Sequence, residues 1–261
     1  MTVTLSDARG LLTGATGGLG HAIARALHAR GASLILTGRQ AAVLEPLAAE
    51  VSGTPLVADL SDPAAVRSML TQAGDVDVLV ANAALPSTGL LPDFDEEDLD
   101  RQLDVNLRAP IVMAHALLAP MVARGSGQIV MIGSVSGLVA SPGSSMYNAT
   151  KFGLRGFAGG LRQDLHGTGV GVSVVMPGFV RDAGMFVKSG MVLPAGVRTV
   201  TPEQVADGVL RAIDKDLGEV VVAPAELRLG AKLGQIAPGI NAAIQRQAGA
   251  ADIVGGHPGG S

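Results

Sequence analysis

Cysteine and tryptophan are absent from this 261-residue chain, and aromatic residues make up only 2% of it. Without cysteine, the protein has neither disulfide bonds nor thiolate ligands for a metal. Its five histidines are scattered without metal-ligand spacing, so we expect no metal site. Alanine and 36 glycines dominate instead. This composition favours helices packed closely on a sheet over a loop-rich all-β shell.

Excess positive charge and long apolar runs are also missing. The net charge is −4 and the sequence pI is about 5.7, so we expect no nucleic-acid partner. The first residues lack the basic and apolar regions of a signal peptide. The longest uncharged run, residues 125–150, is broken by glycine, serine and Pro142, so we expect no integral membrane segment. These features predict a cytoplasmic protein.

Short apolar runs alternate with helical patterns along most of the chain. The runs predict strands at residues 9–13, 33–37, 55–58, 75–81, 128–133, 169–176 and 219–223. This alternation indicates an α/β fold, a Rossmann-type doubly wound parallel sheet of about seven strands with helices on both faces.

The length is sufficient for one large domain. We predict a single dinucleotide-binding and catalytic domain at residues 1–224 and an amphipathic C-terminal extension at 225–248. The extension is broken at Pro238 and Gly239. Residues 249–261 are glycine-rich, and we predict a disordered tail there.

A glycine-rich turn, Gly14-Ala-Thr-Gly-Gly-Leu-Gly20, directly follows the first predicted strand and precedes a helical pattern. Strand, glycine turn and helix in this order are the setting of a dinucleotide fingerprint. Glycines let the backbone approach a pyrophosphate, whose charge is favoured at a helix amino end. The spacing differs from the usual G-x-G-x-x-G, and a lone glycine motif is weak evidence.

The ends of the next two predicted strands bear on the choice of cofactor. An NAD site places an acid after the second strand to hold the ribose 2′-hydroxyl. This chain has Arg39 there, whose planar guanidinium could pair with a 2′-phosphate. We therefore favour NADP(H), with NAD(H) and a merely solvated arginine as alternatives. Asp59 could accept a hydrogen bond from an adenine amino group, although Ser61 and Asp62 also resemble helix-capping residues.

The only tyrosine of the chain, Tyr147, is followed four residues later by Lys151. A helix that starts after Pro142 and Gly143 would place both on one face, one turn apart. A neighbouring cation favours the phenolate and should lower the tyrosine pKa from about 10 toward the working range. Ser134 ends a predicted strand. Such pairs also occur in ordinary helices, so the rest of the chain must decide.

Taken together, these stretches resemble the short-chain dehydrogenase/reductase family over residues 8–224. Six signatures occur in order: Thr13-Gly14-x-x-x-Gly18-x-Gly20, Asp59-Leu60, Asn82-Ala83-Ala84, Asn106, Ser134 with Tyr147-x-x-x-Lys151, and Pro177-Gly178. The resemblance implies that Tyr147 gives or takes the proton, that Ser134 orients the substrate oxygen and that Lys151 lowers the tyrosine pKa and holds the ribose. It also implies that Asn106 holds a proton-relay water through its backbone carbonyl.

The resemblance implies a set of cofactor-binding residues as well. They are Gly14, Thr16, Gly18, Leu19, Gly20, Arg39, Asp59, Leu60, Asn82, Ala83, Tyr147, Lys151, Pro177, Gly178 and Val180. The implied substrate residues are Ser134, Val139, Met146, Tyr147, Met185 and Phe186. Few charges occur in residues 179–200, so we expect a lipophilic small-molecule substrate. The alternative is that these apolar side chains only pack a lid onto the core.

The implied activity is NADP(H)-dependent interconversion of a carbonyl and a secondary alcohol. Members commonly assemble through two helices that correspond here to residues 107–122 and 147–165, so we expect a homodimer or homotetramer. One alternative is a catalytically idle NADP-binding regulatory protein. Another is a sugar-nucleotide epimerase or dehydratase of a longer related family, which the chain length and glycine spacing disfavour.

Overall fold

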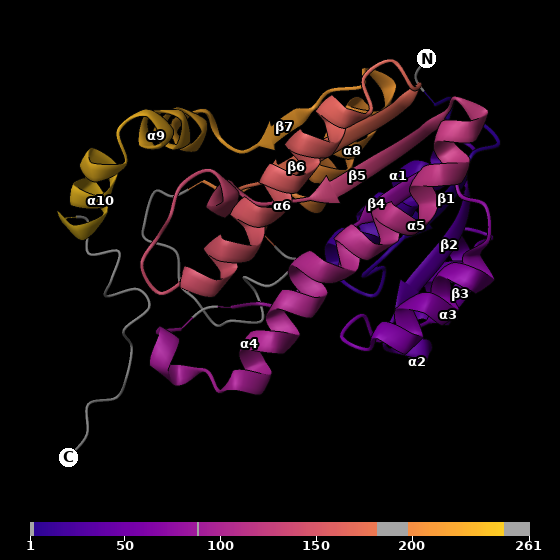
Figure 1. The fold of residues 1–261 in the computed structure, drawn as a ribbon, viewed down its shortest axis with the longest axis horizontal. Coiled ribbons are helices and arrows are strands. Elements are labelled where there is room, and N and C mark those ends of the chain that lie inside the picture. The colour runs from indigo at the N-terminus through magenta and orange to yellow at the C-terminus, as the bar shows by residue number, and fades with distance from the viewer. Residues whose placement is uncertain (1–2, 88, 182–197, 248–261) are drawn as a thin grey trace.

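The computed structural model describes residues 3–87, 89–181 and 198–247, which form one parallel sheet covered by helices (Figure 1). The sheet has seven strands in the order β3-β2-β1-β4-β5-β6-β7. They are β1 (Arg9–Leu12), β2 (Ser33–Gly38), β3 (Thr54–Val57), β4 (Val78–Ala81), β5 (Gly127–Ile132), β6 (Val170–Pro177) and β7 (Glu219–Val222). The predicted fold class is confirmed.

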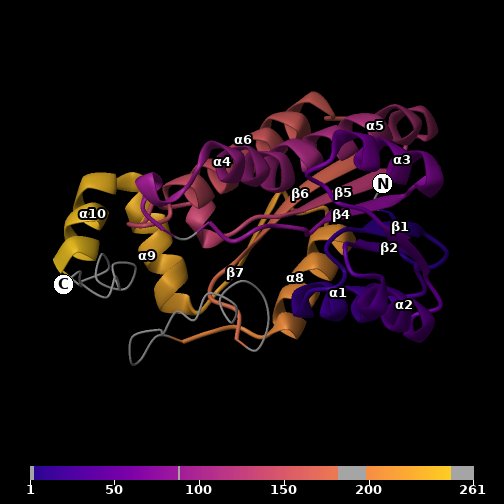
Figure 2. The ribbon, with the colours of Figure 1, turned by 90° about the horizontal axis from the view of Figure 1, so that it is seen from below.

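Helices cover both faces of the sheet, as Figure 2 shows. On one face lie α1 (Gly18–Ala29), α2 (Ala41–Glu50) and α8 (Pro202–Asp214). On the other lie α3 (Pro63–Ala73), α5 (Ala109–Arg124) and α6 (Ser145–Asp164). The chain also forms α4 (Glu96–Leu103), α9 (Ala225–Ile236) and α10 (Pro238–Gln247).

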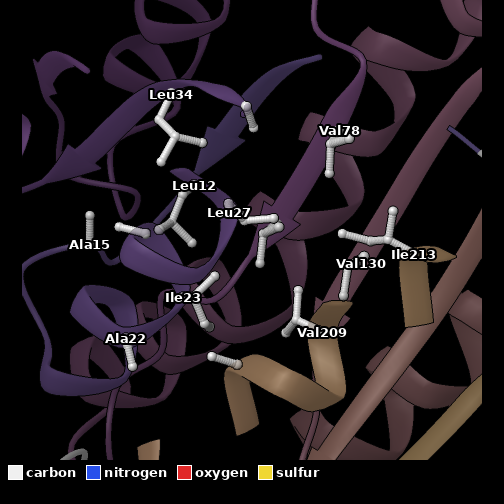
Figure 3. Packing of buried hydrophobic residues seen from close by; sticks show 14 of the residues in the cluster. Leu12, Ala15, Ala22, Ile23, Leu27, Leu34, Val78, Val130, Val209 and Ile213 are labelled. Atoms are coloured by element: carbon white, nitrogen blue, oxygen red, sulfur yellow. The ribbon is translucent and has the colours of Figure 1, made fainter. Parts of the chain in front are cut away.

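The two faces of the sheet carry separate apolar clusters, because successive residues of a strand point to opposite sides. In β1, Leu11 belongs to one cluster and Leu12 to the other. Around Leu12, Ile23 of α1 and Val209 of α8 pack together (Figure 3). Full burial of a leucine or isoleucine stabilises the fold by roughly 1.5–3 kcal/mol. These clusters fix the strands whose carboxyl ends carry the site.

Helix starts next to the sheet are set by local side chains. Asp62 caps α3 by accepting a hydrogen bond from the Ala64 N–H at 2.7 Å, with Pro63 in the first turn. The capping reading of Asp62 is thereby confirmed. Thr201 and Gln204 form a reciprocal capping box at the start of α8.

The helical run Glu96–Arg124, through α4 and α5, is 29 residues long and apolar enough by length and composition to cross a membrane. Its apolar side chains are nevertheless used inside the domain. Met113, Leu117 and Met121 of α5 are buried in the cluster between helices and sheet. The run is therefore a core helix of this fold.

The C-terminal extension leaves the sheet at β7 and forms α9 and α10 (Figure 1). One side of α9 packs inward through the buried Ala231 and Gly234. A Cβ at Gly234 would clash with the side chain of Val139, so the helix lies directly on that residue. The predicted tail at 249–261 lies outside the described residues.

Candidate active site

The glycine turn is fitted so closely to its surroundings that larger residues are excluded at two positions. Gly14 has φ +66°, and a Cβ there would lie 2.7 Å from the Ala83 Cα. A Cβ at Gly20 would overlap the Gly14 carbonyl oxygen. Helix α1 begins at Gly18 with no side-chain cap at Gly17. The helix amino end therefore offers its N–H groups to an anion.

Asn82, which directly follows β4, holds the glycine turn in place. Its amide nitrogen donates to the carbonyl oxygens of Thr13 at 2.9 Å and Gly14 at 3.1 Å. The Thr13 hydroxyl in turn accepts from the N–H groups of Asn82 and Ala83, both at 3.1 Å. Asn82 thus shapes the turn by hydrogen bonds to the backbone of the turn. The candidate residues did not include Thr13, although its place just before the first glycine signals this role.

Arg39 and Asp59 come together at the ends of neighbouring strands. Gly38 pairs with Val57 in the sheet, and the Ala58 N–H donates to the Gly38 carbonyl at 3.1 Å. Arg39 is exposed and has no ion-pair partner within 4.0 Å among the described residues. A Cβ at Gly38 would meet the Thr16 methyl at 2.6 Å, so the glycine turn reaches the same strand end.

The Asp59 carboxylate is held on one side and partly exposed on the other. Its Oδ1 accepts from the Ser61 N–H at 3.0 Å and the Ser61 hydroxyl at 2.8 Å. Partial burial would raise the pKa of Asp59, but the Ser61 hydrogen bonds and the charges of Arg39 and Arg101 outweigh this and lower it. Asp59 is therefore ionised at neutral pH. The next residue, Leu60, is buried.

Ser134 follows β5 after one glycine and is placed by a short 3₁₀ turn, η3 (Val135–Gly137). Its hydroxyl oxygen accepts from the Ser136 N–H at 3.1 Å. A Cβ at Gly137 would lie 2.7 Å from the Lys151 carbonyl oxygen, so η3 packs directly on α6. This contact brings Ser134 close to Tyr147, so that the serine hydroxyl lowers the pKa of the tyrosine and offsets part of the effect of burial.

Tyr147 and Lys151 lie one turn apart on α6, which begins after the Pro142/Gly143 punctuation as predicted. Lys151 is buried, with 2% of its surface exposed, and its ammonium donates to the Ile132 carbonyl at 2.9 Å. The same nitrogen lies 5.6 Å from the centroid of the Tyr147 ring. The predicted pair therefore sits directly beside the end of β5.

The pKa values of the pair differ from the prediction. Burial raises the pKa of Tyr147 to about 12, and the hydrogen bond with Ser134 offsets only part of this. Burial also lowers the pKa of Lys151 to about 8. The expectation that the cation brings the Tyr147 pKa toward neutrality is wrong for this structure. The physical reason is that removal of water from the phenolate costs more than the neighbouring groups return.

Asn106 lies in a π-helical turn, η2 (Asp104–Arg108), between α4 and α5. Its side chain is buried and bonds the backbone of Leu85 twice. The Leu85 N–H donates to Oδ1 at 2.6 Å, and the Asn106 amide donates to the Leu85 carbonyl at 3.0 Å. Wide turns of this type recur at functional sites. Leu85 is the partner that the sequence did not indicate.

The remaining candidates line the same edge of the sheet. Pro177 ends β6, and the Gly178 N–H donates to the Val222 carbonyl at 2.9 Å. Val180 forms an isolated bridge with Val200. Val139, just after η3, and Met146, in the first turn of α6, are both partly buried. Met185 and Phe186 lie outside the described residues.

A doubly wound parallel sheet with a glycine turn and a Ser-Tyr-Lys group at its carboxyl edge defines a nucleotide-binding α/β oxidoreductase. The short chain dehydrogenase model matches residues 10–190. The chain thus belongs to the short-chain dehydrogenase/reductase family.

Individual relatives extend over nearly the whole chain. The chain is 34% identical over 264 residues to the ketoacyl reductase HetN of Nostoc sp., covering 96% of this chain and 92% of that protein. It is similar to a short-chain dehydrogenase from Sphingobium yanoikuyae in complex with NADPH, with a TM-score of 0.76, 27% identity and coverage of 97% and 98%. It also resembles a serine dehydrogenase complexed with NADP+, with a TM-score of 0.75, 30% identity and coverage of 84% and 95%.

Proposed function

We propose that this oxidoreductase interconverts a carbonyl and a secondary alcohol with NADP(H), on a lipophilic small molecule, with Tyr147 as the acid or base. One observation carries the proposal. Ser134 and Tyr147 come together at the end of β5, where Ser134 lowers the tyrosine pKa, and the buried Lys151 ammonium lies 5.6 Å from the centroid of the tyrosine ring. This arrangement can hold and protonate a substrate oxygen.

The residues present fit a dinucleotide with a 2′-phosphate. The turn at Gly14 and Gly20 has no room for side chains, so its backbone can approach a pyrophosphate at the amino end of α1. The exposed Arg39 guanidinium stands at the end of β2, where a 2′-phosphate would need a cation. Two solved relatives hold NADPH or NADP+, which supports this choice.

When bound, the nicotinamide supplies or accepts a hydride. The chain handles the matching proton. Because its pKa is raised to about 12, Tyr147 stays protonated at neutral pH and can donate from its hydroxyl to the substrate oxygen. Ser134 orients that oxygen through the same hydrogen-bond network, and the Lys151 charge stabilises the phenolate that forms.

The substrate is proposed to be a lipophilic ketone or secondary alcohol. Val139 follows Ser134 closely in the sequence, and Met146 directly precedes Tyr147. Helix α9 packs on Val139. Apolar surface buried against such walls contributes about 25 cal/mol per Å² to affinity. The similarity to a ketoacyl reductase supports a ketone. Met185 and Phe186 remain sequence-based candidates for the same pocket.

The test is NADPH oxidation with a homologous series of 2-ketones. We expect kcat/KM to rise with chain length, and Tyr147→Phe to keep less than about a tenth of the rate while binding NADPH normally. A faster Tyr147→Phe enzyme would show that the proton comes from another group. Preference for small charged keto acids would contradict the lipophilic pocket. NADPH binding without turnover on any carbonyl would favour the regulatory alternative.

We also infer a homodimer or homotetramer that uses α5 and α6. Gly153 of α6 packs on the Leu107 side chain, because a Cβ added at Gly153 would lie 3.2 Å from a methyl group of Leu107. At Gly156, Gly159 and Gly160, an added Cβ would meet no atom within 4 Å among the described residues. Such glycines each lower helix stability by roughly 1 kcal/mol relative to alanine, which close contact with a second copy can offset. Action in the cytoplasm is part of this proposal.

A further inference from the structure

Arg101, a residue of α4 outside the sequence-based candidates, reaches the candidate adenine site. Its guanidinium nitrogen lies 3.7 Å from the Asp59 Oδ2. The two residues belong to segments far apart in the chain, α4 and the end of β3. Both side chains are partly exposed, at 43% for Arg101 and 39% for Asp59. The pair therefore stands at the rim of the site rather than in the core.

The ion pair of Arg101 with Asp59 is informative because α4 itself contains a possible partner for Arg101 that is nearer in the sequence. Glu97 precedes Arg101 by four residues, the spacing and order that favour an ion pair on a helix. Among the described residues, however, the ion pair within 4.0 Å joins Arg101 to Asp59. An exposed ion pair adds only about 0–1 kcal/mol to stability. Stability alone gives little reason for this long-range contact.

The contact complements the bonds on the other side of the carboxylate. Ser61 holds Oδ1 with two hydrogen bonds, and Arg101 lies at Oδ2. A distance of 3.7 Å exceeds that of a normal hydrogen bond, so Oδ2 keeps lone pairs for a donor from outside. The charge of Arg39, at the neighbouring strand end, also keeps the carboxylate ionised.

We infer that Arg101 is a positioning residue for the adenine base of the cofactor: it fixes the orientation of the Asp59 carboxylate that accepts from the exocyclic amino group. This inference rests on the proposed dinucleotide function. It makes base selectivity depend on α4, the helix that leads into the Asn106 turn.

The test compares binding of NADPH with that of its deamino analogue, which carries a carbonyl acceptor in place of the amino donor. Dissociation constants come from the fluorescence of the reduced nicotinamide, since the chain has no tryptophan. The unmodified protein should bind NADPH at least tenfold more tightly. Arg101→Gln should reduce that ratio at least threefold, and Arg101→Lys should restore most of it.

Arg108→Gln is the matched control, because Arg108 pairs with Asp104 at 3.8 Å on the adjoining turn, whereas the charges that act on Asp59 are those of Arg39 and Arg101. It should leave the ratio unchanged. In an Asp59→Asn background, Arg101→Gln should have no further effect on the ratio. Equal weakening of both dinucleotides by Arg101→Gln, or an unchanged ratio, would overturn the inference. Because the readout is binding, absence of carbonyl turnover would count against the proposed function and not against this role.

Discussion

Replacement of Lys151 by methionine should stabilise the protein while it abolishes turnover. Burial lowers the pKa of Lys151 from its ordinary 10.5 to about 8. At about 1.4 kcal/mol per pKa unit, the buried ammonium is destabilised by roughly 3 kcal/mol relative to water. Methionine removes that charge, but it leaves the Ile132 carbonyl without its donor, which costs about 1–3 kcal/mol. The net expectation near pH 7.5 is a gain of about 1 kcal/mol.

The pH dependence is a sharper signature than the gain itself. In the unfolded chain, the lysine keeps a pKa near 10.5, so between pH 8 and pH 10.5 the unfolded state binds more protons than the folded state. The free energy of unfolding of the unmodified protein therefore rises with pH in this window. The corresponding contribution is missing in Lys151→Met. Between pH 7.5 and 9.5, the difference between the two proteins should change by about 2 kcal/mol.

Urea unfolding followed by far-UV circular dichroism measures this difference, since one tyrosine and no tryptophan leave little intrinsic fluorescence. Protein concentration is held constant because assembly also affects stability. Tyr147, whose pKa is raised to about 12, reduces stability only above about pH 10, where an unfolded tyrosine ionises. Lys232→Met, at an exposed lysine, is the control. Parallel pH profiles for Lys151→Met and the unmodified protein would refute the reasoning.

Two further predictions concern the cofactor and the assembly. Arg39→Asp should reverse a preference for NADPH over NADH, with each tenfold change in the dissociation constant corresponding to about 1.4 kcal/mol; similar constants for both cofactors in the unmodified protein would contradict the 2′-phosphate role. In sedimentation at micromolar concentration, the protein should be a dimer or tetramer and Gly156→Arg should shift it toward monomer, because a Cβ at Gly156 meets nothing within its own described chain. A monomeric unmodified protein would exclude the α6 interface.

The strands were predictable because each is an apolar run bounded by glycine, proline or charge, and a parallel sheet buries both sides of such runs. The exact ends of the strands were harder to predict than the strands themselves. The expected strand at 75–81 begins only at Val78. Asp77 before it accepts from the Arg9 N–H at 2.9 Å and pairs with Arg124 at 3.3 Å. The Asp77 backbone nevertheless bonds both neighbouring strands, because its N–H donates to the Arg9 carbonyl at 2.8 Å and its carbonyl accepts from the Gln128 N–H at 2.9 Å.

The site was predictable where its residues are close in sequence or follow strands directly. Tyr147 and Lys151 share a helix face, and Ser134 follows β5, so their meeting needs only the order of elements. The contact of Arg101 with Asp59 and that of Gly234 with Val139 join segments with no shared periodicity. The pKa values were equally hidden, because burial depends on every neighbouring element. Sequence patterns indicate which groups come together, but they do not determine how deeply those groups are buried.

The burial of Tyr147 and Lys151 also determines the protonation states in which the proposed reaction begins. A pKa of about 8 leaves Lys151 mostly protonated at pH 7, so its charge stands 5.6 Å from the Tyr147 ring when a phenolate forms. The phenol itself is strongly held in its protonated form under the same conditions. A protonated donor beside a retained cation suits the delivery of a proton to a carbonyl oxygen. Oxidation of an alcohol requires the phenolate first, and above pH 8 the cation that would stabilise it is progressively lost. In the proposed function, burial of the pair therefore keeps the phenol protonated and most of the lysine charged at neutral pH.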